Sequence, residues 1–415
     1  MNYSKLKLLR CFAFAFVTMF ASLILSCKSK EDPAPVPNLP PLAFNVTSSL
    51  STNGQDVILR WNKSKDPEGD AVTYAVVYKD TLVKNLSDTT YTIKNLPFET
   101  EIKGTVVAKD TKGNKTVSSF TMQTGMDYVA IPDVNFEKIL IKLKIDNNQD
   151  GQVLRKNVVG ITYLELSNNN GINADKIKNL TGIEAFTNLE DLNGFNNLLT
   201  SVDISKNNNL KTLYLNGNQL TSLDISKNSG LLLLGCNDNN LTNLDVSKNL
   251  MLASISCYSN KLTSLDISKN LTLLKIYCNN NQLTSLDISK NTSLKVLSCF
   301  DNKLTNITID KNLALIELYC NGNPLNILDI SKNIALSVLY CNNNQLSTFD
   351  VSKNVALFFL NCADNKLTNL DIRKNILMTG FDSRNNQIQT ICVNNLNQVT
   401  KDWQKDPTAT YKVCP

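Results

Sequence analysis

The sequence predicts a mainly β protein, most of it a solenoid, because one phrase returns at a fixed spacing. The phrase reads L-x-x-L-x-C-x-x-N-x-L-T-x-L-D-I-S-K-N, and Leu210 to Asn228 is one copy, with Leu215 at the Cys place. Successive copies are 21 residues apart, a period at which each unit buries its apolar face only against its neighbours. One asparagine recurs at this period without a gap: Asn197, Asn218, Asn239, Asn260, Asn281, Asn302, Asn323, Asn344, Asn365 and Asn386.

Within one coil the same half-pattern occurs twice. Residues 213–218 read L-x-L-x-x-N, and residues 223–228 read L-x-I-x-x-N. Alternating apolar residues indicate a strand with one face inside. The sequence therefore predicts two short parallel strands in each coil, stacked as two parallel sheets on the two sides of a flattened, weakly curved rod.

Both asparagine columns, the one through Asn218 and the one through Asn228, are interpreted as structural. Amides turned inward can satisfy backbone groups at the corners of a coil and pass hydrogen bonds to the next coil.

Seven of the eleven cysteines fall into a third column. Neighbouring strands lie about 4.8 Å apart with parallel Cβ vectors, whereas a disulfide needs Cβ atoms about 3.8 Å apart in a crossed approach. We therefore expect free thiols that act as small buried hydrophobic side chains. A metal ladder is the alternative, but thiols stacked on one side of a coil do not form a tetrahedral cage. The column contains Cys236, Cys257, Cys278, Cys299, Cys320, Cys341 and Cys362.

The frame over residues 189–391 resembles the bacterial leucine-rich repeats of the IRREKO type, including their variant with Cys in the third apolar place. The unit before it, Ile161 to Asn169, needs 28 residues to reach the next asparagine. Its extra segment, Asn179 to Leu189, resembles the helical side of internalin-like repeats. The resemblance implies leucine-rich repeats over residues 161–391.

Residues 1–26 have the pattern of an export signal. Basic residues up to Arg10 precede an apolar run from Cys11 to Leu25, which is too short for an ordinary membrane span. Residues 24–27, I-L-S-C, then resemble a bacterial lipobox, which implies cleavage before Cys27 and a diacylglycerol on its thiol. A cleaved signal followed by an incidental cysteine is the alternative.

Lys30, Glu31 and Asp32 resemble the surface-export signal of Bacteroidota lipoproteins. We therefore expect a lipid-anchored protein of the outer membrane that is exposed at the cell surface, with residues 27–41 as a proline-rich linker.

Residues 42–125 resemble a fibronectin type III domain, a β-sandwich. Trp61 fits the core tryptophan of that family, and Ile102 stands where its corner tyrosine usually lies. Turn-forming residues separate the runs that read as strands. These are residues 57–61, 72–78, 90–93 and 102–108.

Residues 126–160 are expected to form a helical cap over the first coil. Over residues 131–145 Asp133 can cap a helix that places Phe136, Leu140 and Leu143 on one face.

The segment after this helix matches the start of a calcium loop through Asp146, Asn148 and Asp150. Asn157 stands where a bidentate Glu should close that loop, so an Asn- and Asp-rich turn is the alternative.

The C-terminal end, residues 392–415, departs from the frame and is expected to cap the last coil. Ser383 replaces the core cysteine, and Cys392 replaces an aspartate. A disulfide between Cys392 and Cys414 would close a loop of about 22 residues and stabilise the cap by roughly 3 kcal/mol.

Composition excludes several functions. The chain has no histidine, which removes Ser-His and Cys-His nucleophile pairs and imidazole bases. No paired carboxylates outside the regular Asp column and no nucleophile motif are found, so we expect neither an enzyme nor a cofactor. The net charge of +5 is spread among interspersed acids and bases, which argues against nucleic-acid binding.

One face of the solenoid varies from coil to coil, which makes it the candidate binding face. The Asp-Ile-Ser-Lys segments barely change, whereas the outward positions of the other strand change in every coil. Tyrosines among small polar residues favour recognition of a macromolecule, a protein or a glycan, for adhesion or partner binding. A passive sheet in which Tyr serves β-propensity is the alternative. The candidate residues are Tyr214, Tyr258, Tyr277, Phe300, Tyr319 and Tyr340.

Overall fold

The computed structural model describes residues 35–169 and 172–415. The predicted export signal, Cys27 and the Lys30 to Asp32 segment lie outside the described residues. The chain divides between Thr124 and Gly125 into two compact units, each of which encloses its own hydrophobic core. Within the described ranges no helix is long and apolar enough to cross a membrane.

The first unit contains two antiparallel sheets, of order β1-β2-β5 and β4-β3-β6-β7. Both sheets contribute to one core, in which the Trp61 and Tyr74 rings meet edge to face with centroids 5.4 Å apart. The four expected strands are present, and three more were missed. The strands are β1 (Val46–Leu50), β2 (Val57–Trp61), β3 (Thr73–Tyr78), β4 (Asp80–Leu86), β5 (Thr90–Ile93), β6 (Glu101–Lys109) and β7 (Lys115–Gln123).

A short capping segment opens the second unit. Helix α1 (Val134–Lys142) begins at Asp133, whose side chain accepts hydrogen bonds from the N–H groups of Asn135 and Phe136 as expected. The helix is shorter than predicted and ends before Leu143, which is 43% exposed instead of buried. Beside it lie β8 (Tyr128–Ala130), β9 (Gln152–Leu154) and α2 (Arg155–Val158).

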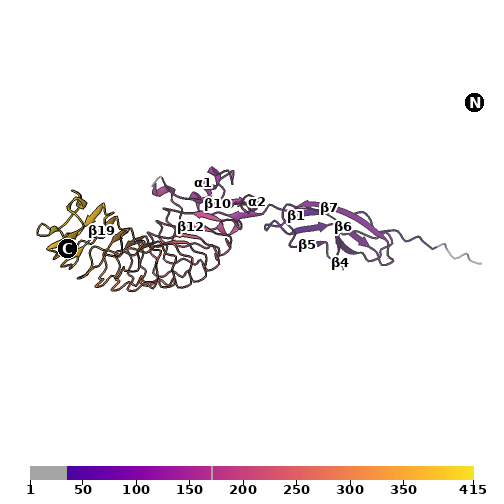
Figure 1. The fold of residues 1–415 in the computed structure, drawn as a ribbon. Helices are drawn as coiled ribbons and strands as arrows, with labels where there is room; N and C mark the ends of the chain where they lie inside the picture. The colour runs from indigo at the N-terminus through magenta and orange to yellow at the C-terminus, as the bar shows by residue number, and fades with distance from the viewer. Residues whose placement is uncertain (1–34, 170–171) are drawn as a thin grey trace, which may run out of the picture. The chain divides into compact units, whose positions relative to one another are not determined.

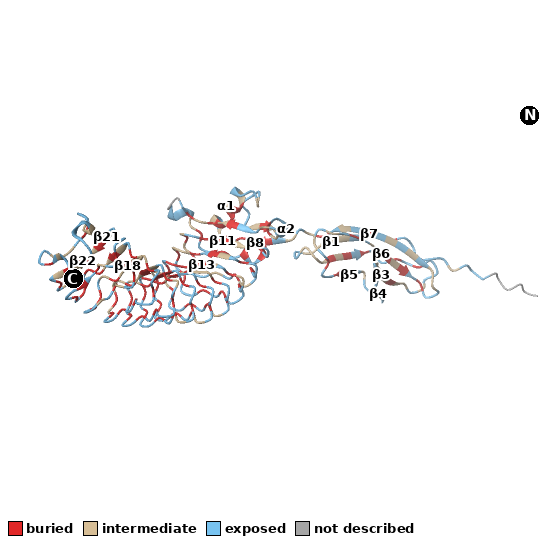
Figure 2. Cartoon of the chain, in the orientation of Figure 1, coloured by how far each residue is buried: buried red, intermediate tan, exposed pale blue. Residues whose placement is uncertain are grey.

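The repeats stack into a solenoid held by one parallel sheet of eleven strands (Figure 1). Each strand supplies a fully buried middle residue, such as Leu213 or Leu297, and two outward residues. The buried positions lie inside the stack and the exposed ones outside it (Figure 2). The strands are β10 (Tyr163–Glu165), β11 (Asp191–Asn193), β12 (Thr212–Tyr214), β13 (Leu233–Gly235), β14 (Ser254–Ser256), β15 (Lys275–Tyr277), β16 (Val296–Ser298), β17 (Glu317–Tyr319), β18 (Val338–Tyr340), β19 (Phe359–Asn361) and β21 (Gly380–Asp382).

The prediction of two parallel sheets is wrong. In the described coils the Asp-Ile-Ser-Lys side forms strands only at the end of the stack, in the parallel sheet of β20 (Leu370–Asp371), β22 (Thr390–Val393) and β23 (Thr410–Val413). Elsewhere this side is a turn, in which, for example, Asp287 accepts the N–H of Ser289 at 2.9 Å. The stack also curves, with its strands on the inner side (Figure 1).

The helical segment expected over Asn179 to Leu189 is reduced to one 3₁₀ turn, η2 (Ile183–Ala185). Two further 3₁₀ turns are η1 (Asn173–Asp175), just before this segment, and η3 (Leu396–Gln398), near the C-terminus.

Each regular coil turns after its strand through one left-handed residue. Asp238, Asn280 and Gly322 occupy this position with φ of 54°, 52° and 62°. Short polar residues and glycine tolerate this conformation best, which explains why Asn, Asp, Ser and Gly alternate there.

The C-terminal segment closes the last coil. The sulfurs of Cys392 and Cys414 are bonded, with Cα atoms 5.4 Å apart, and this disulfide joins β22 to the residue after β23. Trp403 covers the apolar edge by packing on Phe381 with ring centroids 5.2 Å apart. Ser383, at the core cysteine position, is buried as well.

Candidate binding face of the solenoid

The cysteine column lines the interior, as the sequence predicted. All seven thiols are free and fully buried. Burial raises the pKa of Cys257 and of Cys320 to about 12, because a thiolate would lose its hydration. These thiols are therefore packing groups, because the reactive form of a cysteine is its thiolate.

Each asparagine of the first column ties its coil to the preceding one. Asn281 donates to the carbonyls of Cys257 and Cys278, and its Oδ1 accepts the N–H of Leu262 at 3.0 Å. The structural interpretation of this column is confirmed.

The second asparagine column links neighbouring coils on the Asp-Ile-Ser-Lys side. Asn291 is fully buried and donates to Ile267 O at 3.2 Å and to Asn270 O at 2.8 Å, both in the preceding coil. Its side-chain amide thus replaces the backbone ladder that this side lacks.

The sheet face, defined as the outward side of β12 to β19 and the residue two positions after each strand, contains all six predicted site residues. Tyr214, Tyr277, Tyr319 and Tyr340 end their strands, and Tyr214 is the most exposed of these at 36%. The other two, Tyr258 and Phe300, lie two positions beyond β14 and β16. Only Tyr319 and Tyr340 belong to adjacent strands of the sheet.

An aromatic stripe forms where β17, β18 and β19 adjoin. The rings of Tyr319 and Tyr340 stack with centroids 5.3 Å apart, and those of Tyr340 and Phe359 stack with centroids 4.7 Å apart. Phe359 was missed because it opens its strand, in a column otherwise occupied by residues such as Thr212 and Val338. Gly380 follows it on the next strand, and a Cβ there would lie 2.4 Å from the Phe359 ring. The glycine therefore makes room for the ring.

Polar groups border the stripe. The Tyr319 hydroxyl donates to Glu317 at 2.9 Å. Partial burial, together with this bond to the carboxylate, raises the pKa of Tyr319 to about 12. Nearer β15 the Ser298 hydroxyl donates to Asn279 at 3.0 Å.

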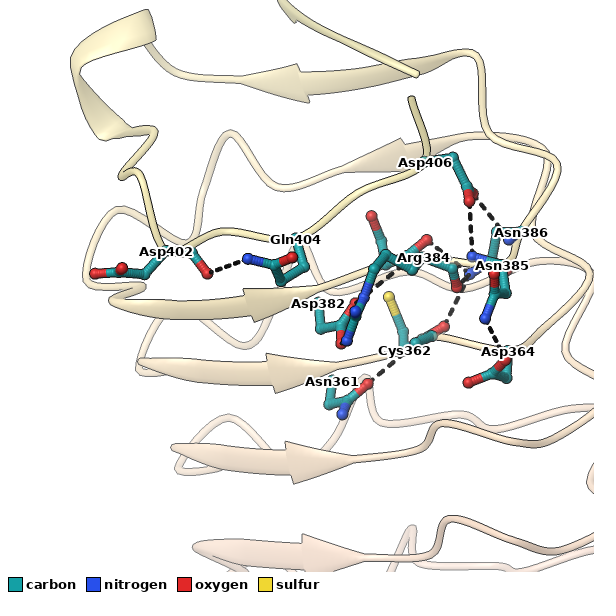
Figure 3. Close-up of polar contacts among 12 residues, drawn as sticks. Asn361, Cys362, Asp364, Asp382, Arg384, Asn385, Asn386, Asp402, Gln404 and Asp406 are labelled. Carbon is teal, nitrogen blue, oxygen red and sulfur yellow. Dashed lines mark hydrogen bonds and ion pairs between the residues drawn. The ribbon is translucent and has the colours of Figure 1, made fainter. Parts of the chain in front are cut away.

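A polar cluster closes the sheet face at the C-terminal end of the stack (Figure 3). Arg384 pairs with Asp382 at 2.7 Å, and Asn385 donates to Asp364 at 2.7 Å. Asp406, from the capping segment, accepts the backbone N–H groups of Asn385 and Asn386. The cluster satisfies the backbone groups of the last coil, which has no further coil to pair with.

The candidate calcium loop is stabilised by bonds to its own chain. Asn148 donates to Asp150 at 2.7 Å, and the N–H groups of Asp150 and Gly151 donate to Glu137, a buried carboxylate of α1 that sequence analysis did not select. Desolvation raises the pKa of Asp146. Among the residues the structure describes, no three acidic, histidine or cysteine side chains are grouped as a metal site.

Comparison with known proteins finds solved structures of similar fold. The sequence matches no family model and no curated protein. Among solved structures, the functional domain of InlJ from Listeria monocytogenes, described as including a cysteine ladder, aligns with a TM-score of 0.63 and 30% identity, over 70% of this chain and 64% of that one. An internalin (inlF) of the same species aligns with a TM-score of 0.53 and 20% identity, over 69% of this chain and 96% of that one.

The second unit is a leucine-rich-repeat solenoid. The chain spans slightly less than two thirds of the InlJ domain, and the likeness is one of fold. The InlJ domain is described as including a cysteine ladder, and in this chain a buried column of cysteines runs from Cys236 to Cys362.

Proposed function

We propose that this protein is a surface lipoprotein whose leucine-rich repeats recognise a protein partner through the sheet face. The observation that carries the proposal is the aromatic stripe of Tyr319, Tyr340 and Phe359 on a rigid sheet, bordered by polar groups. Aromatic residues held in one conformation add contact area at low entropic cost and dominate many protein interfaces. Solenoids commonly bind through extended surfaces of this kind.

The stacking also favours a protein over a glycan as the ligand. A sugar binds an aromatic residue by lying on a free ring face, whereas these rings lie nearly parallel, at 24° and 20°, and cover each other. The ring faces that are turned to each other are closed to a sugar, whereas a protein can contact the stripe with side chains and backbone groups of its own. A glycan-binding accessory lipoprotein is the alternative, and Tyr214, which is 36% exposed, is the residue that favours it.

The remainder of the chain would present this face to its partner. In the proposal Cys27 is the lipid attachment site, and residues 42–125 form a fibronectin type III-like spacer. The two antiparallel sheets that share one core support the spacer. Labelling of the intact cells with radioactive palmitate, for Cys27→Ser beside the native chain, tests the anchor: label that persists in the variant would contradict it.

Capture experiments test the binding face. The chain from residue 28 onward, immobilised as bait, should retain a specific protein from the surface fraction of neighbouring cells, and the variant Tyr277→Ser/Tyr319→Ser/Tyr340→Ser should lose it. The matched control changes Thr263, Thr284 and Thr305, exposed on the flank of the same coils, to Ser. Undiminished capture by the tyrosine variant would remove the sheet face from consideration. Retention of a polysaccharide instead of a protein would favour the alternative.

A further inference from the structure

One flank of the solenoid has an exposed apolar ridge that the fold does not require. The ridge follows the second asparagine column, where the next residue is apolar and points outward in most coils. Thr292 interrupts it once, and the first two coils have Asn208 and Ser229 at the same place. These polar exceptions fold into the same turn, so the apolar side chains are not needed for packing. The apolar ridge consists of Leu250, Leu271, Leu313, Ile334, Val355 and Ile376, which are 55%, 57%, 59%, 62%, 52% and 63% exposed.

A second, less exposed apolar row widens the ridge toward the sheet. Leu232, Leu274, Ile316 and Phe358 occupy one position in alternate coils and are 37% to 45% exposed. The other flank of the same coils presents threonine at the matching exposed place, as in Thr242 and Thr263. The two flanks therefore differ in chemistry although they belong to the same coils, and a run of exposed apolar residues of this length indicates a contact surface.

A row of lysines runs beside the ridge. In each coil the lysine lies two residues before the ridge position, with the buried asparagine between them, as in Lys248 and Leu250. Of this row only Lys311 forms an ion pair in the described part of the chain, with Asp310 at 3.2 Å. The aspartates of the neighbouring column keep their charge, but they accept N–H groups of their own turn, as Asp245 does from Ser247 at 2.8 Å. The row contains Lys227, Lys248, Lys269, Lys290, Lys311, Lys332, Lys353 and Lys374.

We propose that the apolar ridge and the lysine row lie against the headgroup region of a phospholipid bilayer that contains anionic lipids. Leucine, isoleucine and valine replace one another along the ridge, as suits a fluid apolar layer that imposes no side-chain shape. Lysine flanking an apolar strip is the pattern of surfaces that bind at the membrane interface, because the ammonium groups reach the lipid phosphates while the apolar side chains enter the acyl boundary. A second copy of the chain suits this flank less well, because it would bring a second row of lysines to the same interface. The proposal is independent of the sheet face and of lipidation at Cys27.

Vesicle flotation tests the proposal with the chain from residue 28 onward, which carries no acyl chain and retains both hydrophobic cores. The native chain should float with phosphatidylcholine vesicles that contain phosphatidylglycerol, and much less with phosphatidylcholine alone. The variant Leu271→Ser/Leu313→Ser/Ile334→Ser should bind roughly tenfold more weakly. The variant Lys290→Gln/Lys332→Gln/Lys353→Gln should lose the preference for phosphatidylglycerol.

The control is the sheet-face variant Tyr277→Ser/Tyr319→Ser/Tyr340→Ser, which should float like the native chain. Circular dichroism checks that every variant is folded. The proposal is overturned if the native chain does not float or if the ridge variant floats equally well. It is overturned in favour of a dimer if light scattering without vesicles shows a dimer that the ridge variant abolishes. Because the ridge and sheet-face variants are each tested for flotation and for capture, failure of one proposal is distinguishable from failure of the other.

Discussion

The two sides of the solenoid hold their coils together by different means. On the sheet side the backbone joins the coils, as where Cys278 N donates to Ser298 O at 2.8 Å. On the Asp-Ile-Ser-Lys side a side chain does so, as where Asn291 donates to Asn270 O at 2.8 Å.

The difference explains where the sequence is free to vary. A backbone ladder forms whatever the outward side chains are, so the sheet face can exchange Tyr, Ser, Asn and Phe from coil to coil. A ladder of asparagine amides requires the same residue in every coil, so the opposite side repeats its phrase. The sheet face is therefore the side on which the outward side chains can vary without loss of the backbone bonds between coils.

The largest expected effect is the loss of stability when one asparagine of the second column is removed. Asn291→Ala removes the side-chain donor that links this coil to the carbonyls of Ile267 and Asn270 and leaves a buried cavity, which should lower the free energy of unfolding by about 3 kcal/mol. The matched change Asn321→Ala, on the half-exposed sheet face, should cost less than about 0.5 kcal/mol. Urea denaturation of both variants measures the difference. Equal losses would refute the distinction between the ladders.

The second prediction concerns the end of the stack, where the Asp-Ile-Ser-Lys side forms a sheet and a disulfide holds its last strand. Cys414→Ser removes the disulfide to Cys392, which encloses a sequence separation of 22 residues. The expected loss is about 3 kcal/mol by chain entropy, less if the cap unfolds by itself. Proteolysis should then cut the segment after Val393 first. Unchanged protease resistance, or the same number of free thiols with and without reductant in the denatured protein, would count against the disulfide.

The cysteine column gives an effect that depends on pH. Since burial raises the pKa of Cys257 to about 12 while the unfolded thiol titrates near 8.5, the stability that these thiols contribute is intact below pH 8.5 and is lost as the pH rises toward 12. A thiol reagent at pH 8 should therefore modify none of the seven in the native protein and all of them in urea. Rapid modification of the native chain would show that the column is accessible.

The smallest effect concerns the exposed aspartates. Hydrogen bonds from the backbone and side chain of Ser289 lower the pKa of Asp287. The resulting stabilisation is present above the ordinary pKa of the carboxyl group and is lost as the pH falls below it. Asp287→Ala should therefore lower the melting temperature slightly at pH 7 and not at pH 3. A drop of the same size at both values would assign the effect to another interaction.

Sequence reasoning identified the solenoid, both asparagine columns and the buried thiols, because each follows from a periodic constraint that recurs many times. It failed on the second sheet, because the half-pattern at 223–228 has strand-like alternation although Asp224 and Ser226 form a turn. The local hydrogen bond from Ser226 N–H to Asp224 decides that outcome, and alternation of apolar residues does not reveal it. The aromatic stripe was found only in part, because Tyr340 and Phe359 meet diagonally across two strands, a contact that no single column contains.

Photo-crosslinking tests the central claim most directly. A photoreactive amino acid is placed at Tyr319 on the sheet face and, in a second variant, at Ser331, which lies on the opposite side of the same coil. The cells that produce the protein are then irradiated. Recognition through the sheet face predicts a protein adduct from position 319 and none from position 331, whereas adducts from 331 alone, or equally from both, would contradict it.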